Sequence, residues 1–437
     1  MLYPEKSTIE VFQRGQWVAA ADIRAVDVGT CRVEYRADYI FGAHPEPIAL
    51  NLPVGYQPPR MVDRGIGLVE DLTPPSFLFD LVPQGKGRAF LCNALGLADA
   101  DGVVMPLLMA GAFNPIGHLR MTSAVDFFTL QAQKAAAAPR AALGGFTRGD
   151  IVQRCGGYLD QRSVRAMLAA GTTGVQGVAP KFLLATDAQG QWFADMALAD
   201  KQARGHWLLK LPRGKSDADR AVLRNEAAYL RVAAACGLRV YGAPMLVDEM
   251  LFVPRFDRVV DEAGLHRLHQ ESLASVLGLT GFGRTPTQNA LLASLRRVVH
   301  DPLTETIEFL KRDVLNLALR NTDNHARNTA VQTLPSGRVQ LTPVFDFAPM
   351  FMDPEVVVRG CHWVDADGKR LSDWAAVLPH LPLPNDERTQ VRKALRAFAD
   401  VVDALPDTAA ACGAEPDVLA RCAQTIATQA AQLRNLA

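Results

Sequence analysis

The feature that most constrains this chain is an apolar helical run that ends in a short polar segment. The run Val314–Arg320 leads into the segment Asn321-Thr-Asp323-Asn-His325-Ala-Arg-Asn328. Eighteen residues after this segment, Asp346 lies within a second apolar stretch. Carboxylate and amide oxygens bind hard cations, and a carboxylate can also accept a proton. The pattern therefore predicts a catalytic loop with Asp323, Asn328 and Asp346 as its functional groups.

The order Asp, Asn, Asp is that of the catalytic floor of a protein kinase. There the first Asp orients the attacking hydroxyl group, and the Asn and the later Asp hold Mg²⁺ ions on the phosphates. The spacing by itself arises by chance in many chains. A kinase site also requires an upstream lysine on a strand and a glutamate on the following helix, which together position the nucleotide.

Both of these residues are predicted in the required order. Lys210 lies inside a short apolar strand at residues 206–212, where an unpaired ammonium group would be costly. A helix is predicted from Ser216 or Asp217 to about Cys236, and Glu226 lies on its apolar stripe. Either residue alone could equally be a surface charge, but their order favours an ion pair between Lys210 and Glu226.

A glycine-rich loop precedes the lysine. It runs from Gly171 to Lys181 and contains Gly174 and Gly177, and glycines let backbone amides approach an anion closely. The loop is predicted to cover phosphates, with Lys181 as a further contact, although a plain hairpin entrance fits the same glycines. After two more predicted strands, Arg255-Phe256 is predicted to connect two lobes, where backbone groups meet adenine.

Composition restricts the class of protein. The 437 residues allow two or three domains, and a formal net charge of +0 gives no sign of a general nucleic-acid or membrane binder. The 7 cysteines are scattered and form no C-x-x-C pair, which argues for reduced thiols and against a zinc site. No apolar run reaches the roughly 18 residues that are needed to span a bilayer. We therefore expect a soluble, cytoplasmic protein that does not contact membranes.

Strand and helix patterns suggest three domains. Two strands around an Arg14-Gly15 turn, a strand at residues 32–36 and Pro-rich loops precede an Ala-rich stretch at 131–145. We place a boundary there, which gives an N-terminal α/β domain at 1–140, a lobe with the glycine-rich loop at 141–254 and a mainly helical lobe at 255–437. Further expected elements are strands at 182–186, 191–197 and 239–247, a hairpin at 330–341, and helices at 271–279, 288–300, 304–320, 387–405 and 415–436.

These features, in this order, resemble those of the HipA family, serine/threonine kinases that act as toxins of bacterial toxin–antitoxin systems. The resemblance covers nearly the whole chain and is most specific in the segment Asn321–Asn328. It implies an α+β, bilobal, protein-kinase-like fold that follows an additional N-terminal domain. It also implies that Lys210 contacts the phosphates of ATP, that Asp323 is the catalytic base, and that Asn328 and Asp346 bind Mg²⁺. His325 is expected at the nucleotide site, holding the loop by hydrogen bonds rather than acting in catalysis.

The resemblance also implies partners. These are a HipB-like helix-turn-helix antitoxin, DNA only through that antitoxin, and a protein substrate among translation components such as an aminoacyl-tRNA synthetase. Two alternatives stay open at this point. The chain could be a kinase-like regulatory module that works with a DNA-binding antitoxin, or it could be a kinase of small molecules with the same catalytic floor.

One prediction concerns self-inhibition. The family's phosphate loop often carries a serine that the enzyme phosphorylates, and here the loop offers Thr172 and Thr173. A phosphate adds about −1.5 to −2 charges, which would oppose closure of the loop over a nucleotide. Mass spectrometry after incubation with Mg-ATP should find one of these threonines modified, and the modification should be lost in Asp323→Ala. An unmodified loop in an active enzyme would mean that the chain is restrained in another way, most simply by its antitoxin.

Overall fold

The computed structural model describes residues 3–63, 65, 67–136, 144–151, 179–262 and 264–436. The chain forms two compact units, which are described separately. The first unit consists of residues 1–209, 257–271 and 278–282, and the second consists of 210–256, 272–277 and 283–437. The three domain limits expected from the sequence stay predictions.

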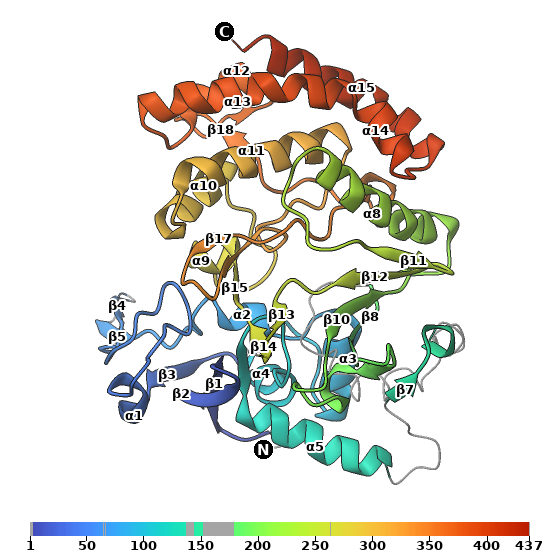
Figure 1. Ribbon diagram of the computed structural model, residues 1–437. Coiled ribbons are helices and arrows are strands. Elements are labelled where there is room, and N and C mark those ends of the chain that lie inside the picture. Colours follow the sequence, from blue (N-terminus) through green and yellow to red (C-terminus); the bar gives the residue numbers. More distant parts are fainter. Residues whose placement is uncertain are drawn as a thin grey trace. The chain divides into compact units, whose positions relative to one another are not determined.

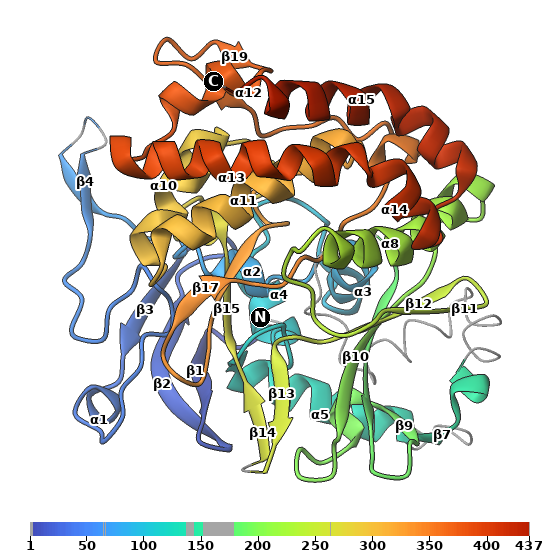
Figure 2. The same cartoon turned by 45° about the horizontal axis from the view of Figure 1, so that its top comes forward.

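The first unit begins with an antiparallel sheet whose strand order is β3-β2-β1-β6. Figure 2 shows β3, β2 and β1 of this sheet. The strands are β1 (Lys6–Gln13), β2 (Gln16–Ala25), β3 (Cys31–Tyr35) and β6 (Leu119–Met121). Arg14 and Gly15 join β1 to β2 and have φ values of 50° and 79°. Two positive φ values are typical of the type I′ turn, which matches the twist of a hairpin. The predicted hairpin at Arg14-Gly15 is therefore confirmed.

Helices and one further pair of strands complete the N-terminal part of the first unit. The further elements of this part are α1 (Ala37–Ile40), β4 (Met61–Asp63), β5 (Leu68–Glu70), α2 (Leu78–Leu81), α3 (Gly85–Ala94), α4 (Met105–Gly111) and α5 (Thr122–Ala136). Every residue of α4 is buried, so this helix is the centre of the core rather than an amphipathic cover. Phe113 and Phe128 stack beside it with ring centroids 4.4 Å apart.

A second sheet in the same unit contains strands in the order β10-β8-β9-β7. Its strands are β7 (Gly144–Phe146), β8 (Lys181–Thr186), β9 (Trp192–Ala194) and β10 (Gly205–Lys210). The strand expected at 191–197 ends early, and Asp195–Ala197 form a 3₁₀ turn. The turn brings the buried Asp195 carboxylate to His206 Nδ1, 2.8 Å away, and to the Asn114 amide, 2.7 Å away. The remaining strands that start in this unit are β13 (Arg258–Asp261), β14 (Gly264–Arg267) and β15 (His269–Ser272).

The second unit contains helix α8 (Asp217–Ala235), whose ends agree with those predicted from the sequence. Ser216 forms a capping box with Asp219, in which each side chain accepts from the other's backbone N–H. At the other end Gly237 has a φ of 77°, and the N–H of Leu238 donates to Ala233 O at 3.0 Å. This is the Schellman arrangement that ends a helix at a glycine.

Long helices form the core of the second unit, and α13 and α15 lie along α11 in both views (Figures 1 and 2). The helices are α9 (Leu273–Val276), α10 (Gln288–Val298), α11 (Pro302–Ala318), α12 (Trp374–Val377), α13 (Asn385–Asp403), α14 (Leu405–Ala411) and α15 (Pro416–Arg434). The helix expected at 271–279 is shorter, because its first residues belong to β15 and Gly278 adopts a φ of 82°.

Short hairpins connect these helices. They are built from β11 (Met245–Val247), β12 (Met250–Pro254), β16 (Ala330–Thr333), β17 (Val339–Leu341), β18 (Trp363–Val364) and β19 (Arg370–Leu371). The hairpin expected at 330–341 is confirmed, with Val331 opposite Leu341. The strand expected at 239–247 is present only at its end. Within the described residues, no helix is both long enough and apolar enough to cross a membrane.

The capping box gives a stability prediction. Ser216→Ala should lower the free energy of unfolding by about 1 kcal/mol, because the N–H of Asp219 loses its acceptor at the helix N-terminus. Ser216→Thr keeps a hydroxyl and should retain most of that stability. Urea titration followed by circular dichroism measures both variants, and equal stabilities for Ala and Thr would contradict this role of Ser216.

Candidate functional site

The site is centred on the ammonium group of Lys210, the last residue of β10. Its side chain is 6% exposed, and its Nζ donates to Glu226 Oε1 and to Asp346 Oδ1. Burial lowers the pKa of Lys210, but the charges of Asp346 and Glu226 outweigh burial and hold the pKa above its usual value. The ammonium group therefore stays charged in a place where an unpaired charge would be unstable.

Glu226 reaches this lysine because of its place on α8. It is buried on the helix face that also carries Leu223 and Leu230. The predicted ion pair between Lys210 and Glu226 is thus present in the structure. The contact between Lys210 and Asp346 was not predicted from the sequence.

Asp346 has an unusual backbone conformation. Its φ is 48°, in the left-handed region that Asp adopts more readily than most residues but that still costs free energy. The two neighbouring phenylalanines are held by aromatic packing. Phe345 lies 5.9 Å from Phe256, and the buried Phe347 lies 5.2 Å from Tyr229, both measured between ring centroids. With both neighbours packed, the Asp346 carboxylate is directed to Lys210.

The candidate catalytic loop, residues 321–328, begins where α11 ends. Arg320 has a φ of 55°, and the N–H of Asn321 donates to Asn316 O at 2.8 Å. This is again a Schellman-type end, here with Arg in place of Gly. The Arg320 guanidinium lies 4.2 Å from the Phe351 ring, which compensates part of the cost of the left-handed backbone. The chain is thereby turned sharply away from the helix axis.

Hydrogen bonds within the loop fix its shape. Asn328 Nδ2 donates to the backbone oxygen of Asp323 at 2.7 Å, and the N–H of Asn328 donates to His325 O at 2.9 Å. His325 Nδ1 accepts from the N–H of Arg327 at 3.2 Å, so a neutral His325 ring carries its proton on Nε2. That nitrogen lies 3.6 Å from Asp323 Oδ1. His325 thus contacts the backbone of its own loop, and its expected role at the nucleotide site stays a prediction.

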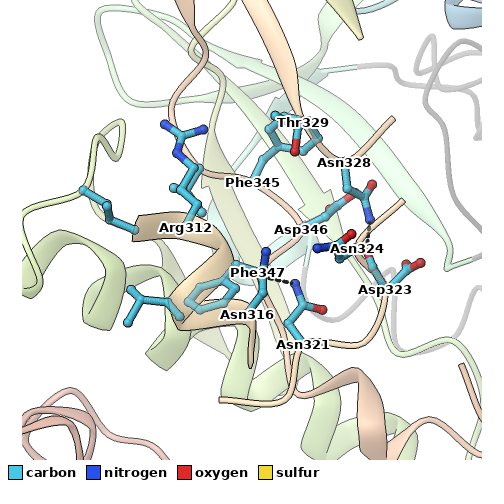
Figure 3. A pocket seen from close by; sticks show the side chains of 13 residues that line it. Arg312, Asn316, Asn321, Asp323, Asn324, Asn328, Thr329, Phe345, Asp346 and Phe347 are labelled. Atoms are coloured by element: carbon cyan, nitrogen blue, oxygen red, sulfur yellow. Dashed lines mark hydrogen bonds between the residues drawn. The ribbon is translucent and has the colours of Figure 1, made fainter. Parts of the chain in front are cut away.

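Three of the predicted functional residues, Asp323, Asn328 and Asp346, line one pocket of the second unit (Figure 3). The residues that line it are Leu238, Arg312, Leu315, Asn316, Asn321, Asp323, Asn324, Asn328, Thr329, Val344, Phe345, Asp346 and Phe347. Asp323, Asn328 and Asp346 are separated in sequence, and the end of α11 and the segment after β17 bring them together. The pocket therefore combines a candidate base with two candidate cation ligands.

The donor set fits Mg²⁺ held together with phosphates. Within the described residues, no three His, Cys, Asp or Glu side chains are grouped as metal ligands. Mg²⁺ at phosphate-transfer sites needs only one or two protein oxygens, because phosphates and water supply the remaining ligands. Asp346 offers a carboxylate, and Asn328 offers its amide oxygen because its amide nitrogen donates to Asp323 O.

The other described residues predicted to contact the nucleotide are not among those that line this pocket. Gly174 and Gly177 lie outside the described residues, as do Thr172 and Thr173. Lys181 is the buried first residue of β8 in the first unit. Arg255 and Phe256 end the first segment of the second unit, where Arg255 is buried and Phe256 packs on Phe345.

One buried carboxylate next to the loop was missed in the sequence. Asp313 lies on the inner face of α11 and is 3% exposed. It accepts a hydrogen bond from Asn324 Nδ2 at 2.9 Å, and Asn324 is the residue after Asp323. An acidic residue between the apolar positions Phe309, Leu310 and Val314 of a predicted helix was the signal that could have revealed it.

Known proteins show which family and fold this chain resembles. The family model described as "HipA-like C-terminal domain" matches residues 173–430. A curated protein of Sinorhizobium fredii (strain NBRC 101917 / NGR234), named "Putative kinase Y4mE", is 32% identical over 146 residues. That match covers 30% of this chain and only 33% of the relative.

Among solved structures, HipA of Shewanella oneidensis MR-1, in a complex with HipB and its operator DNA, has a similar fold. The match covers 98% of this chain and 96% of that chain, with a TM-score of 0.62 and 20% sequence identity. The α+β, kinase-like fold with an additional N-terminal domain, expected from the sequence, is confirmed. The family match spans more than half of the chain, so this protein belongs to the HipA-like family.

Proposed function

We propose that this chain is an ATP-dependent serine/threonine protein kinase and the toxin of a bacterial toxin–antitoxin module. The observation that carries the proposal is the contact of Lys210 with both Glu226 and Asp346, next to a pocket lined by Asp323 and Asn328. This is the set of groups that positions Mg-ATP and an acceptor hydroxyl in protein kinases.

Each residue has a role in the proposed reaction. Lys210 would hold ATP through its phosphates, while Glu226 keeps the ammonium group in place. Asp323 would orient the acceptor hydroxyl and take its proton as the new oxygen–phosphorus bond forms and the bond to the ADP oxygen breaks. Asn328 and Asp346 would hold Mg²⁺, which neutralises charge on the phosphate oxygens.

The toxin role rests on the family. The similar HipA of Shewanella oneidensis was solved with HipB and operator DNA. We propose a HipB-like helix-turn-helix antitoxin for this chain, contact with DNA only through that antitoxin, and a translation component such as an aminoacyl-tRNA synthetase as the substrate. A cytoplasmic location follows from such a substrate.

The first functional prediction concerns the two carboxylates. Asp323→Ala and Asp346→Ala should each reduce phosphoryl transfer by about 10²–10⁴-fold, because one removes the base and the other a cation ligand. Asp346→Ala should also weaken Mg-ATP binding more than Asp323→Ala. Transfer of labelled phosphate from Mg-ATP to casein and calorimetric titration with Mg-ADP measure the two effects.

The matched control is Asp386→Ala, which removes an exposed carboxylate in the first turn of α13. It should keep wild-type turnover. Normal turnover in Asp323→Ala would reject the assigned base, whereas a wild type that binds nucleotide but transfers no phosphate would favour a regulatory module.

The second functional prediction concerns the Lys210–Glu226 pair. A double-mutant cycle tests this pair. The affinity for ATP is measured by titration for the wild type, Lys210→Met, Glu226→Gln and the double variant. Because the pair is buried, we expect a coupling energy of about 0.5–3 kcal/mol. Additive effects of the two substitutions would show that Glu226 does not hold Lys210 for the nucleotide.

A further inference from the structure

Asp313 is a buried carboxylate that accepts several hydrogen bonds next to the candidate catalytic loop. Its Oδ1 accepts from Asn324 Nδ2 at 2.9 Å, from Arg359 Nη2 at 2.7 Å and, more weakly, from Gln288 Nε2 at 3.4 Å. Its Oδ2 accepts from Trp363 Nε1 at 2.8 Å. One buried side chain thus joins three parts of the second unit: the start of α10, the catalytic loop and the segment 359–363.

The contact with the loop constrains Asp323. Asn324 Nδ2 donates to Asp313, and Asn324 Oδ1 accepts from Gln288 Nε2 at 3.2 Å. The amide of Asn324 is therefore held at both ends, and it cannot rotate without the loss of two hydrogen bonds. Asp323 precedes Asn324, and its own backbone oxygen is held by Asn328. The direction of the Asp323 carboxylate into the pocket depends on these two anchors.

The contact with the segment 359–363 is equally well buried. The Arg359 side chain is 14% exposed beside Asp313, so this ion pair is largely shielded from water. Trp363 is 3% exposed, and its ring lies 6.2 Å from Phe309 and 6.2 Å from Trp374. The segment follows Asp346 in the chain. Asp313 therefore connects the loop that carries the candidate base Asp323 to the segment 359–363, which follows the candidate cation ligand Asp346.

We propose that Asp313 is a positioning residue for phosphoryl transfer: it fixes the catalytic loop through Asn324 and joins it to the segment 359–363 through Arg359 and Trp363. The inference rests on the proposed kinase function. Asp313 is not among the residues that line the pocket, so its effect acts through Asp323 and not through contact with the nucleotide.

Glu305 provides a matched control on the same helix. It is a fully buried carboxylate of α11 that accepts from Arg239 Nη2 at 3.0 Å and from the N–H of Leu341 at 2.9 Å. None of these partners belongs to the catalytic loop. A purely structural role predicts that Glu305→Gln and Asp313→Asn have the same effect, whereas the positioning role predicts a difference in turnover.

The test measures ADP formation from Mg-ATP, with casein as acceptor, for folded variants. Asp313→Asn keeps the shape of the side chain but loses its charge and one acceptor oxygen. It should lower kcat on the order of 10- to 100-fold with the KM for ATP changed by less than about threefold, because a small displacement of a catalytic group is costly. Glu305→Gln should keep kcat within about twofold. The double variant Asp313→Asn/Asn324→Ala should be no slower than the slower single variant, since both act on the same anchor.

Hydrogen exchange provides a readout that does not require activity. Asp313→Asn should raise amide exchange in residues 321–329 and in 359–364 together, and Glu305→Gln should leave both segments as in the wild type. If Asp313→Asn shows this linked rise in exchange but the wild type transfers no phosphate, the proposed function fails and the anchoring by Asp313 stands. Wild-type kcat in Asp313→Asn, or exchange raised in only one segment, would overturn the inference. If Asp313→Asn does not fold, Asn324→Ala replaces it in the test. The inference then requires the same loss of kcat and the same rise of amide exchange in the loop.

Discussion

A single buried positive charge, that of Lys210, holds two segments of the second unit in position. The Lys210 ammonium group is almost inaccessible to water and is surrounded by the carboxylates of Glu226 and Asp346. Removing one partner of a buried pair leaves the other charge unpaired, which costs about 3–5 kcal/mol where no other partner is present. Lys210 has two partners, so α8 and the segment after β17 are both held to the end of β10. In the proposed kinase function, Lys210 is thus held in position before a nucleotide binds.

The positions of these two carboxylates have different origins. The position of Glu226 depends on regular structure. The capping box at Ser216 and the glycine end at Gly237 set the limits of α8, and the apolar stripe of α8 sets the rotation of the helix about its axis. Asp346 depends on an irregular backbone with a φ of 48° between two packed phenylalanines. Left-handed residues other than glycine persist only where the surroundings hold them, and they are frequent at functional sites.

The backbone of the candidate catalytic loop is also held by its surroundings. A left-handed Arg320 turns the chain at the end of α11, and hydrogen bonds from Asn328, Asn324 and Arg327 fix the residues that follow. Most of these contacts are between residues a few positions apart. Asp313 is the exception, because it connects the loop to residues as distant as Trp363.

The sequence determined the parts that depend on local patterns. The periodicity and caps of α8, the Arg14-Gly15 hairpin and the order of Lys210, Glu226, Asp323, Asn328 and Asp346 were sufficient for the fold class and the family. Only the tertiary structure decided the contact of Lys210 with Asp346, 136 residues away, and the hydrogen bonds that converge on Asp313. The physical reason is range: helix and turn preferences act over a few residues, whereas the partners of a buried charge are set by which distant segments pack around it.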